Sequence, residues 1–139
     1  MERTFVVLCA LAVALVFNSC DIDGDEQNFH FVSLRIVDVD MPESFELDET
    51  YRINVTFALP DGCTYFEGFD VTKEALTTRE LVAIGSRRTD QDACVQTIRE
   101  VEESFDFIVV HTEPYLFRFY QGEDANGDPQ FIEFDVPVN

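Results

Sequence analysis

The clearest hydrophobic pattern in the chain is the alternation across residues 51–59. The odd positions of this segment carry apolar side chains, and Arg52, Asn54 and Thr56 lie between them. Successive side chains of a strand point to opposite faces, so the pattern predicts a half-buried antiparallel strand. The turn-forming sequence Leu59-Pro60-Asp61-Gly62 predicts where this strand ends.

The same period of two recurs in four other segments, each of which we expect to form a strand. Their inward-facing apolar residues are Val32, Leu34 and Ile36; Phe105, Phe107 and Val109; Phe117 and Phe119 within residues 115–120; and Ile132, Phe134, Val136 and Val138. Asn126-Gly127 separates the last two segments, and both residues tolerate positive φ. The last two strands are therefore predicted to be hairpin neighbours.

Further strands are expected at residues 64–71 and 80–84, with a turn at Gly85-Ser86 and a short helical turn within residues 72–79. Six or seven strands in a chain of this length favour a single antiparallel two-sheet sandwich over a barrel. The pattern resembles the immunoglobulin-like and fibronectin-like folds, although the chain has no tryptophan. A fold resemblance of this kind carries no function with it.

Composition supports one folded and strongly acidic domain. The chain has 139 residues, is 46% hydrophobic and contains 14 phenylalanines, which is enough for one core but not for two. Nine Lys and Arg residues against 28 Asp and Glu residues give a net charge of −19. Such a surface repels nucleic-acid phosphates and anionic lipid headgroups, so no nucleic-acid partner is expected.

The start of the chain has the character of an export signal. Residues 5–17 read FVVLCALAVALVF and contain no charged side chain. A bilayer-spanning helix needs about 20 apolar residues, whereas this length suits the apolar region of a signal peptide. The alternative, a buried core helix, is disfavoured because the segment has no polar face.

Small Ser19 and then Cys20 follow this apolar segment. The sequence resembles the lipobox-type signal of bacterial lipoproteins, in which aliphatic and small residues precede an invariant cysteine. That resemblance implies cleavage before Cys20, a diacylglycerol on its thiol and an acyl group such as palmitate on its amino group. The acidic residues that follow resemble those of surface lipoproteins of the Bacteroidota: Asp21, Asp23, Asp25 and Glu26.

The resemblance also implies a domain organisation and a location. Residues 1–19 are the expected signal peptide, residues 20–28 the lipidated cysteine with an acidic tether, and residues 29–139 the sandwich domain. The lipid bilayer is then a partner through acylated Cys20, with the protein at the outer membrane or cell surface or, alternatively, on the periplasmic face. Ordinary signal cleavage with a soluble periplasmic product remains an alternative.

Cysteine parity predicts a disulfide. Cys9 lies in the expected leader and Cys20 at the expected lipidation site, which leaves Cys63 and Cys94. In an oxidising compartment these two are expected to pair. Two free buried thiols are the alternative, and a metal site is disfavoured because neither cysteine has a CxxC or nearby histidine partner.

No constellation typical of catalysis or of a cofactor occurs in the sequence. The two histidines, His30 and His111, lie outside any motif and are expected at strand ends, and no GxSxG, P-loop, GxGxxG or HExxH sequence is present. Asp124, Asn126 and Asp128 have the spacing of an EF-hand loop, but Pro129 stands where that loop requires glycine. We therefore expect no enzyme, no cofactor and no metal site, with calcium binding there or at residues 21–25 the disfavoured alternative.

The aromatic sequence Tyr65-Phe66-Glu67-Gly68-Phe69 is the candidate contact surface. On a regular strand Tyr65 and Phe69 share one face and Phe66 takes the other, so a large ring is exposed unless both faces are covered. Packing in the core is the competing interpretation. We expect a non-catalytic binding or adhesion module for a protein, peptide or glycan, and the alternative is a structural or accessory subunit of an envelope complex.

Overall fold

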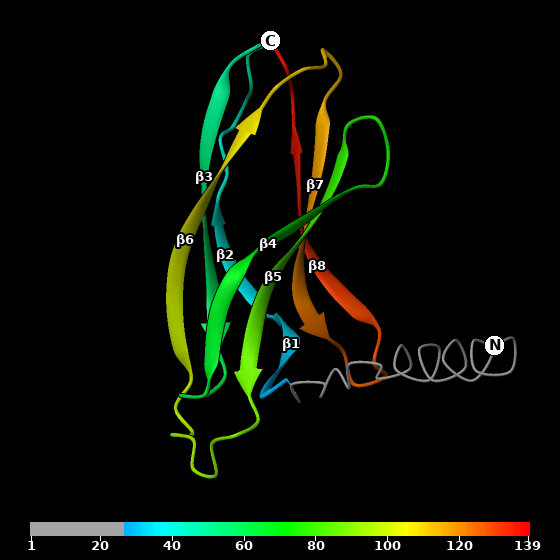
Figure 1. The fold of residues 1–139 in the computed structure, drawn as a ribbon. Coiled ribbons are helices and arrows are strands. Elements are labelled where there is room, and N and C mark those ends of the chain that lie inside the picture. The colour runs from blue at the N-terminus through cyan, green and yellow to red at the C-terminus, as the bar shows by residue number, and fades with distance from the viewer. Residues whose placement is uncertain (1–26) are drawn as a thin grey trace, which may run out of the picture.

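The computed structural model describes residues 27–139, which form eight strands (Figure 1). The predicted signal peptide, Cys20 and most of the acidic tether lie outside the described residues. The strands are β1 Phe29–Leu34, β2 Ile36–Asp40, β3 Thr50–Leu59, β4 Thr64–Lys73, β5 Thr78–Arg88, β6 Arg99–Ile108, β7 Tyr115–Glu123 and β8 Pro129–Val136. Residues 27–139 include no helix with the length and apolar character that a membrane span requires.

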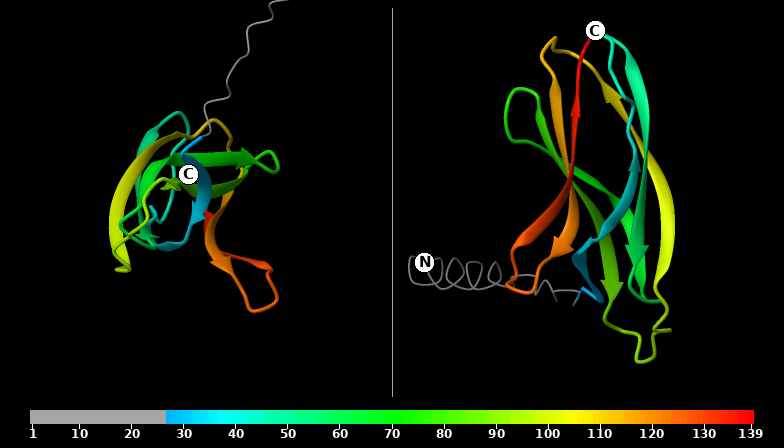
Figure 2. Two further views of the ribbon diagram at one scale, coloured as in Figure 1. Left: turned by 60° about the horizontal axis from the view of Figure 1, so that its bottom comes forward. Right: turned by 180° about the vertical axis from the view of Figure 1, so that it is seen from behind.

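Two sheets pack face to face, which confirms the predicted all-β sandwich (Figure 2). One sheet has the order β2-β3-β6, and the other contains β4, β5, β1, β7 and β8. In the second sheet β4 occupies one edge of β5, while β1 and β7 share the other edge. The first two strands are joined at Arg35, where the chain passes from one sheet to the other.

Every strand pairing in residues 27–139 is antiparallel except that of β5 with β7. The expectation of purely antiparallel sheets is therefore wrong for this pair. Parallel neighbours need a crossover connection. Strand β6 provides it, because the chain crosses to the opposite sheet in β6 and returns in β7 with the direction of β5 (Figure 1).

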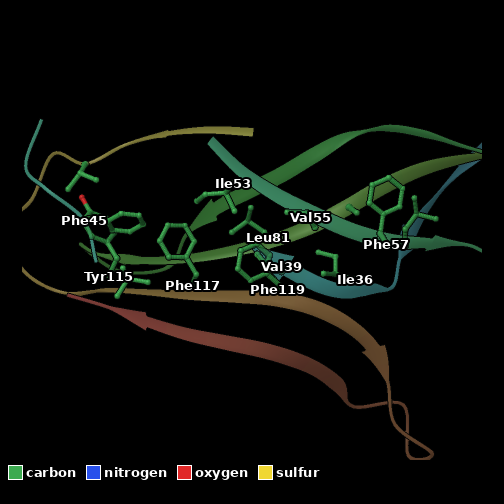
Figure 3. Packing of buried hydrophobic residues seen from close by; sticks show 14 of the residues in the cluster. Ile36, Val39, Phe45, Ile53, Val55, Phe57, Leu81, Tyr115, Phe117 and Phe119 are labelled. Atoms are coloured by element: carbon green, nitrogen blue, oxygen red, sulfur yellow. The ribbon is translucent and has the colours of Figure 1, made fainter. Parts of the chain in front are cut away.

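The core lies between the sheets and is rich in aromatic rings (Figure 3). The predicted alternation holds in β3, where Ile53, Val55 and Phe57 are fully buried. Within the core Phe45 packs against Phe117, with their ring centroids 6.0 Å apart and their planes at 69°. Edge-to-face contact of this kind is favourable beyond the area it buries.

Two local expectations for the middle of the chain are wrong. Gly85-Ser86 lies inside β5 and not in a turn, and residues 72–79 contain no helical turn. Gly85 faces the core where there is no room for a side chain, because an added Cβ would lie 3.0 Å from the carbonyl oxygen of Tyr65 and 3.1 Å from the methyl carbons of Leu34. The glycine therefore reflects close packing of neighbouring strands and not a chain reversal.

We predict that Phe117→Ala lowers the free energy of unfolding by about 3–5 kcal/mol, because it removes a fully buried ring from the centre of the core. Urea unfolding followed by circular dichroism measures this change. Phe31→Ala is the matched control, because the side chain of Phe31 is 65% exposed and its loss should change stability by only about 0.5 kcal/mol. Equal losses in the two variants would contradict this description of the core.

Candidate binding site

Two exposed aromatic side chains lie on either side of β5, on the outer surface of its sheet. Phe31 in β1 lies opposite Ser86, and Ser86 lies opposite Tyr65 in β4. Directly opposed residues of antiparallel strands project to the same side. The side chain of Phe31 is 65% exposed and that of Tyr65 is 48% exposed, so the row Phe31-Ser86-Tyr65 presents two ring surfaces to solvent.

These rings border a hollow of about 390 Å³. We call it the aromatic hollow, and its lining residues are Phe29, Phe31, Tyr65, Glu67, Ser86 and Arg88. The rings of Phe29 and Phe31 meet edge to face, with centroids 5.4 Å apart. The volume lies within the range of pockets that bind small ligands.

The charged groups of the aromatic hollow are already partnered. The hydroxyl of Ser86 donates a hydrogen bond to Oε1 of Glu67. Arg88 donates from Nε to Oδ1 of Asp90 over 2.8 Å and from Nη2 to the other carboxylate oxygen. Hydrogen bonding by Arg88 holds the pKa of Asp90 below its usual value, and the same contact raises the pKa of Arg88.

Phe66 and Phe69, the other two candidate contact residues, both face the core. Their rings lie 4.6 Å and 6.1 Å from the ring of Phe57, between centroids, and both side chains are partly buried. The expectation that Phe69 shares a face with Tyr65 is wrong because β4 contains a bulge between Phe66 and Gly68. The extra residue, Glu67, inverts the alternation for the rest of the strand.

Sequence reasoning found Tyr65 but missed the residues that complete the hollow. A signal for Phe31 was present, because a strand that turns Val32 and Leu34 inward must turn Phe31 outward. Ser86 and Arg88 were not predicted to lie on a sheet face, because a turn was expected at Gly85-Ser86 and the strand was expected to end before it.

A second hollow, of about 420 Å³, lies where the chain passes from β1 to β2. Its lining combines apolar side chains with the hydroxyls of Ser33 and Thr64 and with His30, Arg35, Arg87 and Glu100. Nη2 of Arg87 lies 3.4 Å from Oδ2 of buried Asp61, so this guanidinium supports the fold. His111 follows β6 at the opposite end of the sandwich and lies beside Tyr115, so the structure does not bring the two histidines together (Figure 1).

The predicted disulfide between Cys63 and Cys94 is present, with the two Cα atoms 5.4 Å apart. It joins the connection between β3 and β4 to the connection between β5 and β6. One ligand atom of Asp61 lies within 4.8 Å of both sulfur atoms. Because the sulfurs are bonded to each other, they are not thiolate ligands.

The carboxylate of Asp61 instead organises the start of β4. Its Oδ1 accepts hydrogen bonds from the backbone N of Cys63 over 2.9 Å and from Oγ1 of Thr64 over 2.8 Å. The Thr64 hydroxyl is the main cause that lowers the pKa of Asp61, and the backbone N of Cys63 and the charge of Arg87 also lower it.

At the last hairpin, Asp124 has a similar structural role. Its Oδ1 accepts hydrogen bonds from the backbone N atoms of Asn126 and Asp128 over 2.8 Å and 3.1 Å. Gly127 has φ of +85°, as the Asn-Gly pattern predicted, and β7 and β8 are neighbours. The three polar residues therefore close the turn with one another.

We predict that Asp61→Ala lowers the free energy of unfolding at pH 7 by about 1–3 kcal/mol, because buried donors lose their acceptor. The folded-state pKa of Asp61 is lowered, so its stabilisation is complete above the unfolded value of about 4 and is lost as the pH falls through the folded value. The stability difference between wild type and variant should therefore shrink below pH about 4. Urea titrations between pH 7 and pH 3 measure it, with exposed Asp38→Ala as the control, and a difference independent of pH would contradict the assignment.

Comparison with known proteins gives one family match, and the matched segment lies within the sandwich domain. The family model for the ORF11 beta-sandwich domain matches residues 53–134, from within β3 to within β8. The match includes Tyr65, Glu67, Ser86 and Arg88 of the aromatic hollow and begins after Phe29 and Phe31. Neither the curated proteins nor the solved structures gave a match to the chain. Because the matched segment covers more than half of the sequence, the chain belongs to the ORF11 beta-sandwich domain family.

Proposed function

We propose that this protein is a non-catalytic binding module, held at the outer membrane or cell surface by lipid on Cys20, whose ligand occupies the aromatic hollow. The observation that carries the proposal is the pair of exposed rings, Phe31 and Tyr65, on either side of Ser86. Soluble proteins seldom leave a concave group of large apolar side chains open to water without a binding role.

The exposed rings are not needed to close the core. On the inner face of β4 Phe66 and Phe69 pack against Phe57, and β1 turns Val32 and Leu34 to the core, so the core is covered without Phe31 or Tyr65. Aromatic side chains are also the residues most enriched at recognition surfaces. Their position on the outer face of a paired sheet holds them in a rigid arrangement, which favours binding.

The chemistry of the hollow favours binding over catalysis. Its lining contains two hydroxyls, those of Ser86 and Tyr65, and the Ser86 hydroxyl donates to the carboxylate of Glu67. The lining includes neither histidine nor lysine, the usual general bases that activate a serine nucleophile.

The lipid anchor is proposed from the sequence. The apolar segment 5–17 followed by Ser19 and Cys20 resembles a lipoprotein signal. Two or three acyl chains, each contributing about 0.8 kcal/mol per buried CH₂, anchor a protein stably without a transmembrane helix.

The alternative, an accessory subunit of an envelope complex, is favoured by a different observation. Exposed apolar side chains also occur near the end of the sandwich opposite the start of β1, in or beside the connections there (Figure 1). These residues are Leu47, Leu76, Ile108 and Val110. A partner protein docked at that end would cover them.

We predict that Cys20→Ser moves the protein from the membrane fraction to the soluble fraction of a bacterial host that processes lipoproteins. Fractionation and immunoblotting measure this change, and mass spectrometry of the mature amino terminus identifies the acyl groups. Ser19→Ala, which keeps a small residue before the cysteine, is the matched control and should remain in the membrane. Equal membrane retention of Cys20→Ser and wild type would refute the anchor.

We also predict that the full chain captures an envelope component in a manner that depends on the aromatic hollow. Phe31→Ala and Tyr65→Ala should abolish capture, while Leu47→Ala and Val110→Ala at the opposite end should leave it unchanged. Quantitative mass spectrometry of pull-downs from envelope extract compares the four variants. Capture lost only in the second pair would support the accessory-subunit alternative.

A further inference from the structure

We infer that the aromatic hollow binds an uncharged sugar ring. This inference rests on the proposed function and names the ligand class of the same site. Three properties of the hollow carry it: its charged groups, its two exposed rings and its remaining hydrogen-bonding capacity.

The charged groups of the hollow disfavour an anionic ligand. The lining contains one carboxylate, Glu67, and one guanidinium, Arg88, and each already has a partner in Ser86 or Asp90. An anionic ligand entering the hollow would lose water without gaining an unpaired counter-charge, because Arg88 already pairs with Asp90, and this loss is costly. An anion would also meet the net charge of −19, and a cation would meet Arg88 in the wall.

The two exposed rings suit the apolar faces of a sugar. Phe31 and Tyr65 belong to strands on either side of β5, so their strands are about 10 Å apart, twice the usual spacing. A pyranose ring between or upon them places weakly positive C–H groups against the electron-rich faces of the aromatic rings. Stacking of this kind needs flat rings and not merely apolar side chains.

The polar floor suits the hydroxyl groups of the same ligand. The bond from Ser86 uses Oε1 of Glu67, and a carboxylate has two oxygens that accept several hydrogen bonds. Arg88 uses Nε and Nη2 with Asp90, and a guanidinium has five N–H donors in all. A purely apolar ligand would cover these groups without replacing their water, which costs free energy.

The test begins with native affinity electrophoresis of the detergent-solubilised full chain in gels containing dextran, mannan, xylan or galactan, and polygalacturonate as the anionic comparison. We expect at least one neutral polysaccharide to retard the protein. Titration with oligosaccharides of that polymer should then give the same affinity at 50 mM and at 500 mM salt. The Debye length falls from roughly 14 Å to roughly 4 Å over this range, but charge screening does not act on a neutral ligand.

Ring-specific variants separate stacking from general apolar docking. Phe31→Ala and Phe31→Leu should each weaken binding by about tenfold, while Phe31→Tyr and Tyr65→Phe should bind within about twofold of wild type, because only the latter keep the ring face. Ile98→Ala is the control for an exposed apolar residue, since Ile98 is 71% exposed and lies outside the hollow. Urea midpoints of all variants check that the fold is retained.

Three outcomes would overturn the inference: no retardation by any neutral polysaccharide, preferential retardation by polygalacturonate, or wild-type affinity in Phe31→Leu. Each is distinguishable from failure of the proposed function. If envelope capture still depends on Phe31 and Tyr65, the hollow is a binding site whose ligand is a protein. If the wild-type protein captures no envelope component, or captures it as well as the Phe31 and Tyr65 variants do, the proposed function fails as well.

Discussion

Strand β5 is the element on which the rest of the structure depends, because its backbone hydrogen bonds hold three other strands. Its first residues, 78–81, lie parallel to β7, and residues 83–88 pair with β1. Strand β4 pairs along most of the opposite edge. Satisfying both edges of one long strand is the usual way in which a buried backbone keeps its donors and acceptors paired. The row Phe31-Ser86-Tyr65 exists only because β5 separates β1 from β4.

The alternation of apolar residues was sufficient to predict most strands and the sandwich class, because burial of one face imposes a period of two. Its limits appear where a local feature overrides that period. Gly85 was read as a turn residue, although its lack of a side chain serves close packing against Leu34. The bulge at Glu67 depends on pairing with β5, and the parallel pairing of β7 depends on the path through β6, so neither is visible in a single segment. For the same reason Tyr65 was identified, but its partners across the sheet were not.

The edges of the two sheets carry features that oppose pairing with other chains. Glu103 lies opposite inward-facing Val55 on edge strand β6, yet it remains exposed. Strand β4 has its bulge at the edge, and β8 begins with Pro129, next to an irregularity between Tyr120 and Gly122. Inward charges, bulges and prolines are known obstacles to edge-to-edge aggregation. An acidic surface adds mutual repulsion, which further opposes pairing of the edges between copies of the chain.

The aromatic hollow lies at the start of β1, which is close in sequence to Cys20. Phe29 lines the hollow and follows Cys20 by nine positions, and a chain of that length spans at most about 30 Å when fully extended. With Cys20 acylated as proposed, Phe29 would remain within this distance of the bilayer that holds the lipid, and the exposed rings would lie on the sheet beside it. The protein would then act in cis, on molecules that its own cell displays or that are concentrated at the surface of that cell. A partner on another cell would have to extend to within this distance of the bilayer.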